Sequence, residues 1–242
     1  MEKKNICIII PGFIKSYNHL YYLKKIFSKL DANIYFFGYI FDYMIHPCTF
    51  RNNISYDPDK NEKLCKYKLK SFFTDFDFID NNTYNIYNIK NYDNRIFSQW
   101  NNIYKSFELY LKFQKRTKIK CNFFIKLRSD YYFQDFDLFT NHIYNTYYSN
   151  KLFLYFYNEK NQIYSDHIFM GNFDNFQIIS NLSLHYDYYF AILESKYQSK
   201  KSVSNILFEE QSEYLLTEYI GDKIKKENII ISSKNIGKIV RK

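Results

Sequence analysis

The sequence predicts an α/β protein with a mixed, mainly parallel sheet and helices on both of its faces. Continuous apolar runs rich in β-branched residues, which are typical of strands covered on both faces, alternate with segments whose apolar residues recur at helical spacing. No Pro-, Gly- or Ser-rich linker interrupts this alternation, and 242 residues can bury a sizeable core. We therefore expect one domain over residues 1–242, with irregular excursions at about residues 46–61 and 80–94.

Charge and composition narrow the function classes. The chain carries a formal net charge of +9, but its basic residues are spread along the whole sequence, and only five of the 34 are Arg. A nucleic-acid-binding surface would more convincingly cluster Arg, whose guanidinium group forks onto phosphates and bases. Tyr and Phe supply almost all of the 22% aromatic fraction. Because the whole composition is biased in this way, the many Tyr residues are no evidence for a ligand that stacks on aromatic rings.

The cysteines and the apolar runs favour a reducing compartment. Cys7, Cys48, Cys65 and Cys121 follow no CxxC or metal-finger spacing, so we expect free thiols. The apolar run near the N-terminus is short, is broken by a Pro-Gly pair and lacks a small-residue cleavage site, which disfavours a signal peptide. No apolar run approaches the length of a membrane span. We expect a cytoplasmic protein without a transmembrane segment.

The first predicted unit is a strand, a short polar loop and a helix. Residues 6–11 form a continuous β-branched run, and Gly12 then allows the backbone to approach a ligand closely. Lys15 precedes a segment with helical spacing over residues 17–30, whose start offers oriented N–H groups to an anion. The loop matches neither GxGxxG nor GxxxxGK[ST], so neither a classical dinucleotide site nor a P-loop is predicted.

The next predicted strand also ends at a polar residue, and two predicted helices follow it. Residues 33–41 read as a strand that ends at Asp42, whose carboxylate could meet a ribose hydroxyl or could lie on the surface. A basic amphipathic helix is predicted over residues 62–73, followed by a short strand over 76–79. The strongest helix pattern covers residues 96–117, and we expect its apolar stripe to face the core.

The stretch CNFFIKLRSDYYF, residues 121–133, is the most informative one. A run that reads as a buried strand leads into Lys126 and then presents Arg128 and Asp130, which point the same way because strand side chains alternate between the two faces. Ligands of parallel α/β sheets bind beyond the carboxyl ends of the strands, where a cation beside an anion suits a phosphate and its metal ion. The alternative is an intramolecular ion pair that caps the strand end.

The last third continues the alternation. An acid and an imidazole, Asp166 and His167, stand immediately before a short apolar run and a glycine, and Glu213 lies within a helical pattern. The predicted strands here are residues 151–157 and 228–231, and the predicted helices are residues 173–196 and 202–220.

In this order, four pieces of the chain resemble a known family. They are IIIPGFIKS, FSQWNNIYKSFELYLKFQK, FFIKLRSDYYF, and SDHIFMGNFDNFQIISNL with the later SEYLLTEYI. The chain resembles GT-A type glycosyltransferases of the WavE-like group, which are associated with lipopolysaccharide, capsule or other surface glycan synthesis in bacteria and large DNA viruses. The resemblance implies a single-domain GT-A fold and transfer of a sugar from a nucleotide-diphosphate sugar to a hydroxyl of a glycan or glycoprotein.

Residue by residue, the resemblance implies a donor site. Gly12 and Lys15 would line the donor-nucleotide pocket, with Lys15 standing where an Arg is commoner. Asp130 matches the last acid of the family's DxD-like motif, so it would reach a divalent metal ion, Mn²⁺ or Mg²⁺, or the sugar diphosphate. Arg128 occupies the position of the first Asp of that motif, and this departure leaves strict metal dependence undecided.

The resemblance also implies an acceptor side. Asp166 matches the acid of the SDxxxxG element, and Glu213 matches the acid that opens the later helix, for which a structural role is an equal alternative. We expect His167 on the acceptor side as well. His167 and His185 are also candidates for a third metal ligand, against the alternative that each is a structural residue.

The required chemistry agrees with these residue types independently of the family. Lys15, Arg128 and a metal ion can neutralise the leaving diphosphate. If the anomeric configuration inverts, Asp166 is our choice of general base; if it is retained, Asp166 would orient the acceptor. Two alternatives from other classes stay open: a basic domain that binds single-stranded nucleic acid, although none is expected as a partner, and an inactive scaffold of a glycan-assembly complex.

Overall fold

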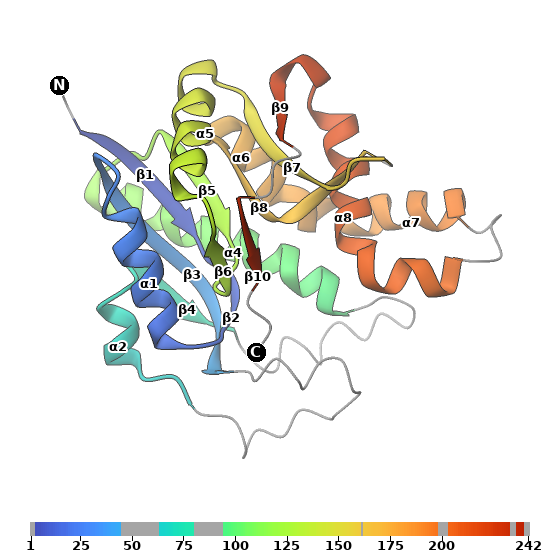
Figure 1. Ribbon diagram of the computed structural model, residues 1–242. Coiled ribbons are helices and arrows are strands. Elements are labelled where there is room, and N and C mark those ends of the chain that lie inside the picture. The colour runs from blue at the N-terminus through green and yellow to red at the C-terminus, as the bar shows by residue number, and fades with distance from the viewer. Residues whose placement is uncertain are drawn as a thin grey trace.

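A central sheet organises the computed structural model, which describes residues 3–44, 63–79, 94–160, 162–197, 203–232 and 236–239. The sheet has eight strands in the order β2-β3-β1-β5-β8-β7-β9, with β4 paired to β3 (Figure 1). The pairs β1–β3, β1–β5, β2–β3, β3–β4 and β7–β9 are parallel, whereas β8 runs antiparallel to β5 and β7. The strands are β1 (Lys4–Ile9), β2 (Gly12–Ile14), β3 (Ala32–Met44), β4 (Asp75–Phe78), β5 (Phe123–Leu127), β7 (Leu152–Asn158), β8 (Ile163–Asn172) and β9 (Ile229–Ser232).

Helices cover both faces of this sheet, and each face has its own apolar core. In Figure 1, α1 and α5 lie in front of the sheet and α4 passes behind it. The first core joins the sheet to α1, α2 and α5, and the second joins it to α4, α6, α7 and α8. The helices are α1 (Tyr17–Phe27), α2 (Lys66–Lys70), α4 (Asn94–Thr117), α5 (Phe136–Ser149), α6 (Phe173–Ser180), α7 (Tyr186–Tyr197) and α8 (Val203–Lys223), with short 3-10 helices η3 (Asn181–His185) and η4 (Lys226–Asn228).

This architecture confirms the predicted mixed, mainly parallel α/β fold. Strand β1 has the β-branched sequence expected of a central strand, and Cys7, Ile8 and Ile9 are fully buried between β3 and β5. The helix predicted over residues 96–117 is α4, and its stripe Trp100, Ile103 and Phe107 lies in the second core. That the chain forms one domain stays a prediction.

Several features differ from the sequence prediction, among them β2 and β8, which were not identified as strands. The helix expected over residues 62–73 is the shorter α2, and the continuous helix expected over 173–196 is broken by η3 into α6 and α7. Helix α5 was not predicted, although Asp135 caps it by accepting a hydrogen bond from the Leu138 amide at 2.8 Å. A two-stranded antiparallel ribbon of β6 (Tyr131–Phe133) and β10 (Gly237–Ile239) was also not predicted. The excursion at 46–61 lies outside the described residues, as do 80–93.

Strand direction decides where polar side chains can meet. The carboxyl ends of β1, β3 and β5 lie at one edge of the sheet because these strands are parallel. Strand β8 runs the other way, and its residue Ile168 pairs with Leu127 at the end of β5. His167 and Asp166 therefore lie beyond the end of β5, at the same edge as the residues that follow β2 and β5.

Within the described ranges, the thiols agree with one further expectation. Cys7, Cys65 and Cys121 are free, while Cys48 lies outside those ranges. None of the helices in the described part of the chain is long and apolar enough to cross a membrane.

Candidate functional site

The loop between β2 and α1 brings the first site residues to the sheet edge. Gly12 has a φ of +84°, a left-handed conformation that favours glycine, at the break between β1 and β2. Ser16 caps α1 by accepting a hydrogen bond from the His19 amide at 3.1 Å. Lys15 lies between these two points, and its side chain is 21% exposed. The helix cap and the left-handed residue together fix the backbone position from which the Lys15 side chain extends.

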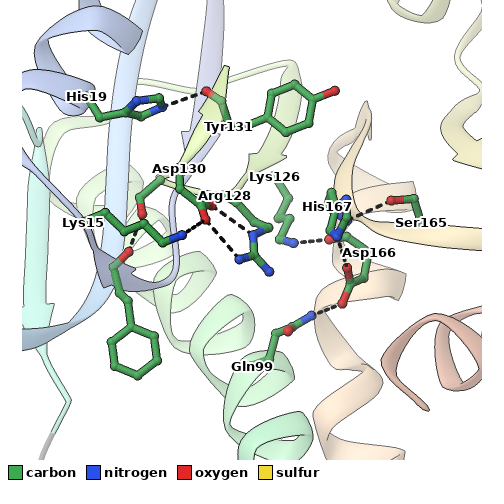
Figure 2. A network of polar contacts seen from close by, with 12 residues as sticks. Lys15, His19, Gln99, Lys126, Arg128, Asp130, Tyr131, Ser165, Asp166 and His167 are labelled. Carbon is green, nitrogen blue, oxygen red and sulfur yellow. Dashed lines mark hydrogen bonds and ion pairs between the residues drawn. The ribbon is translucent and has the colours of Figure 1, made fainter. Parts of the chain in front are cut away.

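Asp130, which follows β5, pairs with both Arg128 and Lys15 (Figure 2). Arg128 Nε donates to Asp130 Oδ1 at 3.0 Å, and Arg128 Nη2 donates to Asp130 Oδ2 at 3.2 Å. Lys15 Nζ lies 2.5 Å from Asp130 Oδ2. The Asp130 side chain is 4% exposed, whereas that of Arg128 is 37% exposed. The intramolecular ion pair is thus present, but its guanidinium group keeps contact with solvent.

The charges of this triad, Lys15, Arg128 and Asp130, do not cancel. Burial would raise the pKa of Asp130, but the neighbouring Arg128 and Lys15 outweigh burial and hold that pKa well below its usual value. Two cations therefore share one carboxylate, and the triad carries a net positive charge. Both carboxylate oxygens of Asp130 face a cation.

Two further contacts hold the loop after β5 in place. The Ser129 hydroxyl donates to the carbonyl oxygen of Phe13, and His19 Nε2 lies 2.8 Å from the carbonyl oxygen of Tyr131. These contacts join the β5–β6 loop to β2 and to α1. The triad consequently rests on three elements that come from distant parts of the sequence.

Lys126 connects the triad to the adjacent part of β8. It is 1% exposed, and its ammonium group donates to the backbone carbonyl oxygen of Asp166. Burial lowers the pKa of Lys126 to about 8, although the nearby Asp166 charge opposes that effect. The sequence signal for Lys126 was a charged residue inside an otherwise apolar strand, but sequence reasoning gave it no role.

Asp166 is held by side chains from two helices. Its Oδ2 accepts a hydrogen bond from Gln99 of α4, and Ser212 of α8 also donates to its carboxylate. Gln99 Nε2 lies 3.0 Å from Ser212 Oγ. Sequence reasoning missed Gln99 and Ser212, because a polar residue at the border of a helical apolar stripe has no distinctive spacing.

Asp166, His167 and Glu213 form a compact cluster of metal-ligand types. One ligand atom from each of the three lies within 4.8 Å of the others, and His167 Nε2 lies 3.7 Å from Asp166 Oδ1. Burial lowers the pKa of His167 to about 4, so its imidazole is neutral at neutral pH. The two buried carboxyl groups have opposite shifts. Burial and the Asp166 charge raise the pKa of Glu213, whereas Lys126 and His167 outweigh burial and lower the pKa of Asp166.

The structure thus brings together most of the residues singled out from the sequence. Lys15, Arg128 and Asp130 form the triad, and Asp166, His167 and Glu213 form the cluster. Lys126 lies between the triad and Asp166 (Figure 2). The donor, acceptor and metal-binding roles of these residues stay predictions.

Two other candidates lie apart from this network. Asp42 lies within β3, and among the described residues its buried Oδ1 has no hydrogen-bond partner and its side chain makes no ion pair with the triad or the cluster. His185 is exposed and stacks on Tyr219, with ring centroids 6.0 Å apart. His185 is not part of the metal-ligand cluster found among the described residues.

The comparisons with known proteins find a likeness in structure. No protein-family model matches the chain, and no curated protein matches it. The structure is similar to the crystal structure of a glycosyltransferase involved in the glycosylation of the major capsid of PBCV-1. The two share 9% sequence identity and a TM-score of 0.44, over 94% of this chain and 82% of that one.

Proposed function

We propose that the chain is a glycosyltransferase that moves a sugar from a nucleotide-diphosphate sugar to a hydroxyl of a glycan or glycoprotein. The observation that carries the proposal is the edge where Lys15 and Arg128, with net positive charge, lie beside the Asp166 cluster beyond the end of β5. Glycosyl transfer needs both kinds of group, cations for the leaving diphosphate and a carboxylate near the acceptor hydroxyl. Membership of the chain in the WavE-like group rests on sequence resemblance alone and is part of this proposal.

The donor half of the site uses the triad. Arg128 and Lys15 would bind the diphosphate oxygens, and Asp130 would position both cations by pairing with them. Each charge-assisted hydrogen bond of this kind contributes about 1.5 to 3 kcal/mol. Gly12 would allow the β2 backbone to approach the nucleotide, and Asp42 would accept a hydrogen bond from a ribose hydroxyl.

The acceptor half uses the cluster. Asp166 is ionised at neutral pH, because Lys126 and His167 lower its pKa despite burial. It would take the acceptor proton if the configuration inverts and would orient the acceptor if the configuration is retained. His167 and Glu213 would stand beside it.

The proposal includes a divalent ion, Mn²⁺ or Mg²⁺. Asp130 suits this role less well, because Arg128 and Lys15 would compete with the ion for its oxygens. The donor set of Asp166, His167 and Glu213 does fit a metal ion. A bound divalent ion would supply positive charge that stabilises developing negative charge on oxygen.

A binding and cleavage assay tests the proposed function. We expect one nucleotide-diphosphate sugar, from a panel screened with and without MnCl₂, to raise the melting temperature, since a ligand at about a hundred times its Kd stabilises by about 2.7 kcal/mol. The same sugar should release its nucleoside diphosphate over time. A chain that binds the sugar but never cleaves it would be the inactive scaffold, and a panel without any thermal shift would contradict the proposal.

A further inference from the structure

The Asp166 cluster contains a buried carboxyl group, Glu213, that forms no ion pair among the described residues. Glu213 is 5% exposed, and among the described residues the one hydrogen bond to its carboxyl group comes from its own backbone amide. No Lys or Arg pairs with it within those residues, in contrast to Asp130. Buried carboxyl groups are normally paired, hydrogen-bonded or bound to a metal ion. The Glu213 carboxyl group instead lies within ligand distance of Asp166 and His167.

The neighbouring cation does not occupy the ligand atoms of this cluster. The Lys126 ammonium group donates to the backbone carbonyl oxygen of Asp166, not to its carboxylate. Gln99 binds Asp166 Oδ2, so Asp166 Oδ1 is the oxygen that faces His167 Nε2, at 3.7 Å. Gln99 and Ser212 thereby orient the carboxylate in the way that outer-shell partners orient metal ligands.

The spacing of the three ligand atoms suits one ion. Ligands of a small divalent ion lie about 2.1 Å from it, so in a tetrahedral site they are about 3.4 Å apart. Atoms within 4.8 Å of one another therefore need to move by less than about 1 Å each. One imidazole nitrogen and two carboxylate oxygens favour a first-row transition ion over Mg²⁺, which prefers oxygen ligands and keeps its water.

We propose that Asp166, His167 and Glu213 bind a divalent transition-metal ion such as Mn²⁺, and that Asp130 does not ligate it. This inference deepens the proposed function. The role of the ion in catalysis rests on that function, whereas binding of the ion can be measured without any sugar. It also narrows that function: an Asp166 carboxylate committed to a metal ion orients the acceptor side and does not serve as the general base.

Electron paramagnetic resonance of the full chain titrated with MnCl₂ tests this site. We expect one bound Mn²⁺ per chain, with a nitrogen modulation in the pulsed spectrum from the His167 imidazole. MgCl₂ should displace Mn²⁺ only at an excess of tenfold or more. A spectrum of bound Mn²⁺ without nitrogen modulation would overturn the proposal, and this readout on the natural sequence needs no variant to fold.

Matched variants locate the ligands. His167→Gln should remove the nitrogen modulation, and both His167→Gln and Glu213→Gln should weaken Mn²⁺ binding by tenfold or more. His185→Gln, a second histidine outside the cluster, and Asp130→Asn should leave the Mn²⁺ affinity within twofold of the natural value. Loss of the modulation in His185→Gln, loss of binding in Asp130→Asn, or unchanged binding in Glu213→Gln would each overturn it. These outcomes are independent of sugar transfer, so a failed metal site and a failed glycosyltransferase function are distinguishable.

Discussion

The carboxylate of Asp130 is paired with two cations and almost completely buried, so its removal should be costly. We expect Asp130→Asn to reduce the free energy of unfolding by about 2 kcal/mol at pH 7, less than for a fully buried pair because Arg128 keeps solvent contact. Urea unfolding measures this cost. Asp31→Asn is the control, because Asp31 is 86% exposed and its pair with Lys3 spans 3.8 Å; its cost should stay below about 1 kcal/mol.

The same carboxylate should make stability depend on acid. Burial raises the pKa of Asp130, but Arg128 and Lys15 lower it further than burial raises it, so the folded pKa lies below the unfolded value of about 3.9. The stability contributed by Asp130 is therefore present above about pH 4 and lost as the pH falls through the folded pKa. The difference between the natural chain and Asp130→Asn should shrink below about pH 4. A constant difference down to pH 2.5 would contradict the ion-pair account.

Gln99 should contribute to stability through its hydrogen bond to Asp166. Gln99→Met keeps the side-chain size but removes the amide that bonds Asp166 and lies beside Ser212. We expect a loss of about 1 to 3 kcal/mol in the free energy of unfolding, because a buried hydrogen-bonding group loses its partner. Chemical unfolding of this variant measures the loss. If Gln99→Met unfolds like the natural chain, the amide does not hold Asp166 in solution.

Among the elements, β3 shows how closely the sheet and its covering segments approach. A Cβ atom at Gly38 would lie 2.7 Å from Phe73 Cε1 and 2.9 Å from the carbonyl oxygen of Ile10. We expect Gly38→Ala to destabilise the fold by about 1 to 3 kcal/mol, since a backbone oxygen cannot move away cheaply. Gly221→Ala in α8 is the matched control, because nothing lies within 4 Å of its Cβ position. That variant should be neutral or stabilising by up to about 1 kcal/mol, and thermal unfolding of both variants compares them.

Elements with one clear periodicity could be predicted from the sequence, and elements that depend on tertiary contacts could not. The β-branched run of β1 and the long apolar stripe of α4 predict a buried strand and a core helix, and both are present. Helix α5 has a capping Asp135 and ends at Asn150 with φ 55°, but its aromatic and β-branched residues are weak helix formers. Its helical state relies on burial of Phe139 and Ile143 in the first core. The ribbon of β6 and β10 joins residues about a hundred positions apart, which no local pattern reveals.

The candidate site could be predicted only in part, for a similar reason. Arg128 and Asp130 stand out locally because charged residues end an apolar strand, and the order of elements placed Lys15 at the same sheet edge. The partners of these residues depend on the fold. Lys15 and Arg128 both turn toward Asp130, and Gln99 reaches Asp166 on β8 from helix α4.

At the scale of the whole molecule, the net charge of +9 keeps nucleic-acid binding as the competing account. Affinity for single-stranded nucleic acid depends steeply on salt, because binding releases counterions from the phosphates. A nucleotide sugar carries few charges, so its binding should change far less between 50 and 200 mM salt. Fluorescence anisotropy with a labelled oligonucleotide compares the two. Nanomolar oligonucleotide binding at 200 mM salt, without binding of any nucleotide sugar, would favour the competing account.

The most direct test of the central claim is donor affinity in a pair of arginine variants. Arg128→Gln removes the guanidinium group of the triad, while Arg116→Gln removes one that is 69% exposed on α4. By isothermal titration calorimetry with the nucleotide-diphosphate sugar that stabilises the natural chain, we expect Arg128→Gln to weaken binding by about 10- to 150-fold, which corresponds to about 1.5 to 3 kcal/mol. Arg116→Gln should bind as the natural chain does. Equal affinity in Arg128→Gln and Arg116→Gln would contradict the account.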